Sequence, residues 1–284
     1  MKQTVLFILL ICVVCAGVFG QSAGDFVVNG IVLVKYQGTA KDVVIPTNLK
    51  IAEIGFQAFR NNRDITSITI PSGVTVIGDS AFESCINLTI VTIPSSITSV
   101  GNRAFFHCSR LASITIPSRV TSIGDAAFNG CKSLITVSIP SGVTDIGDLV
   151  FSFCESLAQI NVDSQNVAYS SIDGVLFDKG NAILMKYPEN KQGQNYVIPN
   201  GVKQIADSAF SECTNLTSII IPDSVVSIEE YSFAGCENLT EITIPASVKE
   251  VKWGAFAYCD ALPAAIRADI IKRFGEDVFQ IGGG

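Results

Sequence analysis

The sequence predicts a repeat solenoid, a coil of stacked copies built around a parallel β-sheet. Two observations lead to this fold class. The dipeptide Ile-Pro and the dipeptide Ala-Phe each return at a spacing of 23 residues through most of the chain. Short runs such as "SITI" in each copy alternate between apolar and polar side chains, which is the period of a β-strand. One such strand cannot bury its apolar face alone, so the copies must stack on one another.

The repeating unit can be written IPxxVxxIGxxAFxxCxxLxxI. Its proline, which ends a strand because it has no N–H for the ladder, is found at Pro46, Pro71, Pro94, Pro117, Pro140, Pro199, Pro222 and Pro245. Its phenylalanine is found at Phe59, Phe82, Phe105, Phe128, Phe151, Phe210, Phe233 and Phe256. A cysteine follows three residues later at Cys85, Cys108, Cys131, Cys154, Cys213, Cys236 and Cys259, while the first copy has Asn62 there.

The repeats are interrupted once and need a cap at each end. Residues 173–199 echo residues 29–46, because both run from Asn/Asp-Gly through β-forming residues to Lys-Tyr and then to Val-Ile-Pro. We therefore expect these parts in chain order: an N-terminal β cap (21–45), five repeats (46–162), an internal β-hairpin module (163–198), three repeats (199–262) and a C-terminal cap helix and tail (263–284). The helix is predicted by apolar residues at helical spacing, with Pro263 near its start: Ile266, Ile270, Ile271 and Phe274.

The unit resembles the leucine-rich repeats, and most closely the BspA-like subfamily of exported bacterial and protozoan surface proteins. The resemblance covers about residues 26–280. It departs from the general leucine-rich pattern, because Ile93 is followed by Pro94 rather than by the expected asparagine or cysteine. The resemblance implies a right-handed coil that binds partners rather than catalysing a reaction. It also implies attachment to host matrix proteins or cells and coaggregation between microbes.

The N-terminus has the features of a secretory signal peptide. Lys2 precedes an apolar run from Val5 to Phe19, which is shorter than the roughly 20 residues of a membrane-spanning helix. We expect cleavage after Gly20, so that residues 1–20 are removed and the chain is secreted or held at the cell surface. The alternatives are a buried core segment and a lipid anchor on Cys12 or Cys15. No second apolar run of spanning length follows, so no transmembrane segment is expected.

The charge of the chain argues against nucleic-acid binding. The formal net charge is −7, only 16% of the residues are charged, and lysine and arginine do not cluster. A protein that binds nucleic acid needs a basic surface to neutralise phosphates.

The cysteine ladder allows three interpretations. A small apolar side chain that fits a tight corner of each coil is the interpretation we favour. Disulfides between adjacent coils are the second, since stacked positions lie within reach of one another, although seven cysteines remain after cleavage at Gly20 and seven is odd. A metal site is the third, but the spacing lacks the paired ligands of a zinc motif. No cofactor is expected.

Other polar motifs carry weaker signals. His107, the one histidine, precedes Cys108, but the matching position varies between copies and no nucleophile–base pair is implied. An acidic residue recurs in the turns at Asp79, Asp125, Asp148 and Asp207, with Asn102 between them. This column predicts turn chemistry rather than a calcium ladder, which needs several converging oxygens. Asn87, Asn215 and Asn238 each begin an Asn-Leu-Thr sequon, and their glycosylation is left open.

The outward face of the sheet is the predicted binding surface. When the central residue of each strand points inward, its two neighbours point outward and form two columns rich in hydroxyl groups. The later column holds Thr69, Thr92, Thr115, Ser138, Asn161, Ile220 and Thr243. The earlier column holds Ser67, Ile90, Ser113, Thr136, Gln159, Ser218 and Glu241. Threonine also suits any exposed strand, so the columns indicate a binding surface without naming its ligand.

A second predicted contact surface is the internal module, through its aromatic residues Tyr169, Phe177, Tyr187 and Tyr196. Together these features favour a secreted or surface-exposed adhesin that binds an extracellular protein or cell-surface ligand, with oligomeric state unassigned. Two alternatives are a structural protein of the cell envelope and a protein that binds ice or crystals through its threonines. Ile90, Asn161, Ile220 and Glu241 interrupt the regular face that ice binding requires.

Overall fold

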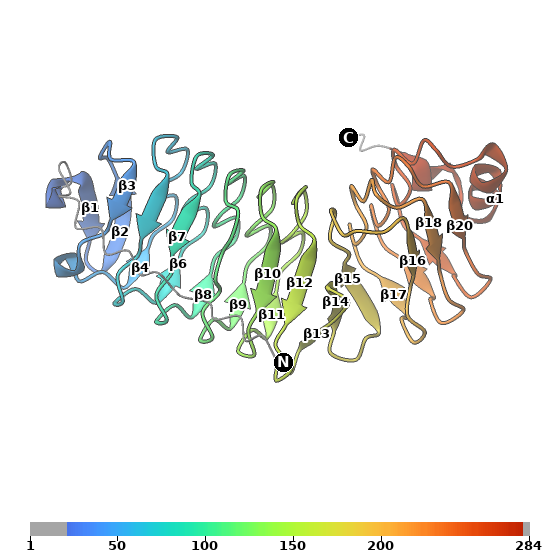
Figure 1. The fold of residues 1–284 in the computed structure, drawn as a ribbon, viewed down its shortest axis with the longest axis horizontal. Helices are drawn as coiled ribbons and strands as arrows, with labels where there is room; N and C mark the ends of the chain where they lie inside the picture. Colours follow the sequence, from blue (N-terminus) through green and yellow to red (C-terminus); the bar gives the residue numbers. More distant parts are fainter. Residues whose placement is uncertain (1–21, 281–284) are drawn as a thin grey trace, which may run out of the picture.

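The computed structural model describes residues 22–280, which form a row of stacked coils (Figure 1). The row runs from β1 at one end to α1 at the other, and the module β13–β15 lies between two sets of coils. We call the repeats of residues 46–162 the first block and those of residues 199–262 the second block. The predicted signal peptide lies outside the described residues, as does the C-terminal Gly-Gly-Gly.

The predicted strands form one row of short parallel strands, which we call the outer row. Its members are β3 (Asp42–Val44), β5 (Ser67–Thr69), β7 (Ile90–Thr92), β10 (Thr136–Ile139), β12 (Gln159–Val162), β16 (Asn195–Val197), β18 (Ser218–Ile220) and β20 (Glu241–Thr243). They pair as three separate sheets, β3-β5-β7, β10-β12 and β16-β18-β20. The predicted strand at 113–115 does not form, which separates the first sheet from the second.

The missing strand lies where the coils pack less tightly beneath the outer row. Val91 and Ile93 are only half-buried, although the matching residues Ile68 and Ile70 are buried. No hydrogen bond joins the backbone of residues 112–116 to β7, whereas Thr89 N–H still donates to Thr66 C=O on the other side of that coil. Neighbouring coils therefore separate on this side, and the ladder between them is lost.

A second row of strands was not predicted. It is made of two-residue strands from the Val-x-x-Ile-Gly part of each unit: β4 (Glu53–Ile54), β6 (Val76–Ile77), β8 (Ser99–Val100), β9 (Ser122–Ile123), β11 (Asp145–Ile146), β17 (Gln204–Ile205), β19 (Ser227–Ile228) and β21 (Glu250–Val251). These strands pair in parallel and unbroken within each block. Two residues are too few for alternation to reveal a strand in a sequence.

The predicted β-hairpin elements are confirmed, and the echo between the two segments reflects equivalent structures. In the N-terminal cap, β1 (Phe26–Asn29) pairs antiparallel with β2 (Val32–Tyr36), which pairs in parallel with β4. In the internal module, β13 (Tyr169–Ile172), β14 (Val175–Asp178) and β15 (Ile183–Lys186) pair antiparallel, and β15 pairs in parallel with β17. Each hairpin thus presents a strand edge on which a block of repeats begins.

The C-terminal cap is the predicted helix, α1 (Ala264–Phe274), preceded by Pro263. Its Arg273 donates hydrogen bonds to the carbonyls of Ile244 and Pro245 in the last coil. The described residues also contain three short 3₁₀ helices: Ala23–Asp25, Thr47–Leu49 and Glu276–Phe279.

The core is a continuous column of aromatic rings within each block. In the first block the rings stack from Tyr36 through Phe59 to Phe151 with centroids 5.0–5.9 Å apart. In the second block they stack from Tyr187 through Phe210 to Phe256 at 5.1–5.2 Å. Two hydrophobic clusters result, one for each block.

Candidate binding surfaces

The outward columns are exposed along the outer row. Thr69, Thr92, Thr115, Ser138, Asn161, Ile220, Thr243, Ile90, Ser113, Thr136, Gln159 and Glu241 are exposed, and Ser67 and Ser218 are half-buried. Strand register aligns the columns, since Thr69 pairs with Thr92 and Ser138 pairs with Asn161. The face is broken at residues 113–115 and again by the internal module. It is therefore three short polar patches rather than one uninterrupted ladder.

Three of the four aromatic residues singled out in the internal module are buried in the core, which corrects their interpretation as ligand contacts. Phe177 is fully buried, and Tyr169 and Tyr187 are 9% and 2% exposed. Tyr187 begins the aromatic column of the second block on Phe210, and Tyr169 accepts a hydrogen bond from the N–H of Ile146. Tyr196 is half-buried against Tyr187, with ring centroids 4.8 Å apart. The block that follows the module needs an apolar end to stack on, and these rings supply it.

The seven cysteines within residues 22–280 are buried and free of disulfides. Each thiol donates to the backbone carbonyl of the aromatic residue 26 positions earlier, as Cys85 does to Phe59 at 3.1 Å and Cys108 to Phe82 at 3.1 Å. Burial raises the pKa of the Cys85 thiol to about 12, so the thiol stays neutral. Among residues 22–280 no group of three or more histidine, cysteine, aspartate or glutamate side chains is placed so that it could hold a metal ion.

The side chains of the acidic column form hydrogen bonds between the turns of adjacent coils. Asp79 accepts from the N–H of Asn102, Asn102 from that of Asp125, and Asp125 from that of Asp148, at 2.8–2.9 Å. Each side chain thus binds the same position of the next coil, which explains why asparagine replaces aspartate without breaking the column. His107 is exposed and its ring lies 4.2 Å from that of Phe106.

A buried ion pair joins the two blocks. The ammonium group of Lys186 donates to the carboxylate of Glu189 and to the carbonyl of Ser208, both at 3.3 Å. The N–H of Phe153 donates to Glu189 Oε1 at 2.7 Å. In an uninterrupted part of the coil, the N–H at the same repeat position, that of His107, donates instead to a backbone carbonyl of the next coil. Glu189 therefore replaces a coil that is absent at this point. Its burial raises its pKa, which the charge of Lys186 opposes.

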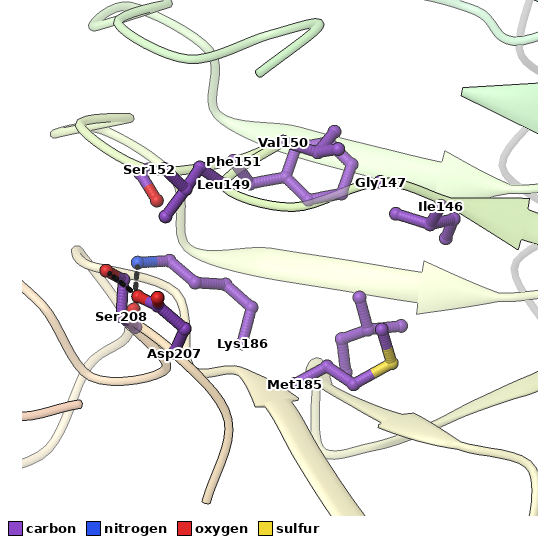
Figure 2. Close-up of a pocket in the computed structure, with 11 residues that line it drawn as sticks. Ile146, Gly147, Leu149, Val150, Phe151, Ser152, Met185, Lys186, Asp207 and Ser208 are labelled. Carbon is purple, nitrogen blue, oxygen red and sulfur yellow. Dashed lines mark hydrogen bonds between the residues drawn. The ribbon is translucent and has the colours of Figure 1, made fainter. Parts of the chain in front are cut away.

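A cavity of about 40 Å³ lies beside the ion pair. Figure 2 shows Lys186 running past the turn of residues 149–152, with its ammonium end at Ser208. This cavity is large enough for a water molecule but too small for an organic ligand. The junction is therefore a packing feature rather than a ligand site.

An open groove where the end of the internal module meets the second block was missed by sequence reasoning. It has a volume of about 600 Å³, and the side chains that define it are Gln192, Gln194, Thr214, Asn215, Asn238 and Thr240. We call it the amide groove. The sequence analysis singled out Asn215 and Asn238 only as the first residues of sequons. Their position side by side in adjacent coils follows from the stacking of the repeats in the structure.

Between Ser22 and Gln280, no helix has both the length and the apolar character needed to cross a membrane.

Comparison with solved structures finds bacterial leucine-rich repeat proteins of similar architecture. A leucine rich cell surface protein from Faecalibacterium prausnitzii A2-165 is 30% identical, with 86% of this chain and 81% of that chain covered and a TM-score of 0.52. A leucine-rich repeat protein from Eubacterium ventriosum is 29% identical, with 82% and 66% covered and a TM-score of 0.64. The pneumococcal vaccine antigen PcpA shares the fold at 23% identity, with 84% and 73% covered and a TM-score of 0.67.

The comparison with curated proteins gave no match. The repeat pattern described as the BspA type leucine rich repeat region matches residues 52–180 and 186–281, in six copies. These matches extend over most of the described coils, and the chain belongs to the BspA type leucine-rich repeat family.

Proposed function

We propose that this chain is a secreted or surface-exposed adhesin that binds an extracellular protein or the surface of another cell. The observation that carries the proposal is the exposed outer row, most of whose outward side chains are uncharged and polar. The exposed apolar side chains among them are Val44, Ile90, Val197 and Ile220. A solenoid presents such an extended face to its partners. We find no constellation of reactive side chains in residues 22–280 that would support an enzyme instead.

The mechanism we propose is many weak polar contacts distributed over three patches. The face lacks the tryptophan, tyrosine and arginine residues that dominate tight protein interfaces. Attachment would then gain strength from several patches, or several copies of the protein, engaging one surface together.

The experiment is a binding assay of the chain from Gln21 on a panel of purified extracellular-matrix proteins and on intact epithelial cells. The test variant carries Thr69→Arg and Thr92→Arg, which place two large charges on one patch. The control carries Ser72→Arg and Ser95→Arg, which add the same charges at exposed turn positions of the same two repeats. We expect the test variant to bind more weakly than the unchanged chain, because one of the three patches is altered, and the control to bind as the unchanged chain does. Equal binding by both variants would contradict the proposal.

The alternative is a structural protein of the cell envelope, and localisation separates it from an adhesin. Protease added to intact cells of the source organism must digest an adhesin, because the adhesin has to be reachable from outside. Complete protection from protease, together with no binding to any matrix protein or cell, would favour the envelope role.

A further inference from the structure

We propose that the amide groove binds a linear, uncharged glycan, with successive sugar rings lying along successive coils of the second block. The groove runs beside the start of strands β16, β18 and β20, and its residues are not those of the outward columns. The proposal is therefore independent of the protein-binding role of the outer row.

The chemistry of the groove favours a neutral ligand rich in hydroxyl groups. Its lining contains carboxamide and hydroxyl side chains, one alanine and no charged side chain. A phosphate, a sulfate or an acidic sugar would find no cation to pair with it. A peptide would find no apolar pocket for an anchoring side chain. Sugar hydroxyls both donate and accept hydrogen bonds, which is the capacity that amides and hydroxyls offer in return.

Several of these side chains are held in place yet keep unused hydrogen-bonding capacity. The hydroxyl of Thr240 donates to the carbonyl of Thr217 at 3.2 Å, which leaves its oxygen free to accept. The Nδ2 group of Asn238 donates to the carbonyl of Thr214 at 2.9 Å, which leaves Oδ1 free. Within residues 22–280, the side chain of Asn215 makes one long hydrogen bond, of 3.5 Å from Nδ2 to Oδ1 of Asn190. The groove is thus partly organised before a ligand arrives, which lowers the entropy cost of binding.

The distance between adjacent coils indicates that the ligand is an extended chain of sugar rings. Asn215 and Asn238 occupy the same position in adjacent coils, as do Thr217 and Thr240. Their coils are separated by 5.1 Å, measured between the ring centroids of Phe210 and Phe233. The same amide and hydroxyl therefore recur at an interval close to the length of one hexopyranose ring in an extended chain. A glycan aligned with the row of coils would meet the same pair of partners at two successive rings, with Gln192 and Gln194 at the preceding coil.

The first block serves as an internal comparison, because the same positions there do not repeat the pair. Asn87 and Thr89 form it once, but the next coils have Arg110 with Ala112 and Ser133 with Ile135. Arg110 is exposed, and Ile135 is 54% exposed. The coil accepts charged and apolar side chains at these positions, so folding alone does not require the neutral set found in the second block.

The test measures binding of neutral hexasaccharides of glucose, mannose, xylose and N-acetylglucosamine, with hexagalacturonate as the charged comparison. The chain from Gln21 is produced in bacteria, so that its sequons stay unmodified, and binding is followed by isothermal calorimetry. We expect at least one neutral hexasaccharide to bind, and hexagalacturonate not to bind. Asn215→Ala and Gln194→Ala should each weaken that binding by about tenfold, which corresponds to about 1.4 kcal/mol. Both side chains are exposed, and thermal melting verifies that each variant folds.

The matched control is Asn87→Ala, which changes the same Asn-Leu-Thr context in the first block and should leave glycan binding unchanged. Two results would overturn the proposal. One is that no neutral hexasaccharide binds at millimolar concentration. The other is that a hexasaccharide binds equally well to Asn215→Ala and to the unchanged chain. If Asn215→Ala instead reduced binding only to a matrix protein, the groove would be a protein site and the glycan assignment would be wrong.

Discussion

At the scale of single residues, the cysteine of each repeat has a defined structural task. Its thiol fills the corner between the aromatic column and the leucine, and it donates to a buried carbonyl of the preceding coil. Alanine would fill less of that volume and would leave the carbonyl with one bond fewer. Aspartate would place a charge where no partner exists.

We therefore expect Cys85→Ala to lower the free energy of unfolding by about 1–3 kcal/mol, from the lost hydrogen bond and the small cavity. Cys85→Asp should prevent stable stacking, because a buried unpaired charge is far more costly. Urea denaturation followed by circular dichroism measures both effects. Binding by Cys85→Ala should equal that of the unchanged chain, and its loss in a folded variant would show that the cysteine takes part in binding.

The same burial predicts how the thiols react. The chain from Gln21 has seven cysteines, all buried, and neutral buried thiols react slowly with alkylating reagents. We expect almost no labelling by iodoacetamide in native buffer and seven labelled thiols in urea without reductant, counted by mass spectrometry. A count below seven in urea would reveal disulfides between coils.

The aromatic residues of the module show where reasoning from the sequence alone stops. The Lys-Tyr echo identified Lys35-Tyr36 and Lys186-Tyr187 as equivalent, and the structure places both tyrosines at the start of an aromatic column. Tyr187 lies outside the 23-residue repeats, so the repeat spacing does not align it with the phenylalanines of the core. The sequence alone therefore predicts an exposed side chain on a hairpin. Only the pairing of β15 with β17 brings this tyrosine over Phe210.

At the scale of elements, strand prediction depended on length. The three- and four-residue strands of the outer row alternate clearly, and their inward residues are buried as expected, as Ile68 and Val137 show. The two-residue strands carry no such signal, yet they form the unbroken sheets. The amide groove was hidden for a related reason, because it is built from residues 23 positions apart that only the stacking of coils brings together.

The junction between the blocks depends on one ion pair, Lys186 with Glu189. Removing one partner leaves the other buried without its counter-charge, so Lys186→Met should lower the free energy of unfolding by about 3–5 kcal/mol. The double change Lys186→Met with Glu189→Leu should recover a large part of that loss, because two apolar groups need no compensation. Chemical denaturation of both variants provides the measurement. A double variant less stable than Lys186→Met would mean that the bond from Phe153 to Glu189, and not the charge pair, dominates the junction.

At the scale of the whole molecule, the chain is two solenoids joined by a module rather than one uniform coil. The stability of a solenoid is approximately a sum over repeats and the contacts between neighbours. Within a block those contacts are stacked aromatic rings. Between the blocks, no ring contact joins Phe151 to Tyr187 in the part of the chain that the structure describes, and the buried ion pair lies at that point.

This architecture predicts that damage to one block stays largely within it. Phe105 and Phe233 are matched, since each is fully buried and stacked between two rings at 5.1–5.5 Å. Replacing either one with alanine should lower the stability of its own block by about 3–5 kcal/mol. Hydrogen exchange should then accelerate in β16, β18 and β20 for Phe233→Ala, with β5, β10 and β12 little changed, and the reverse for Phe105→Ala. Equal acceleration across both blocks in either variant would mean that the polar junction couples them as tightly as the aromatic columns couple their coils.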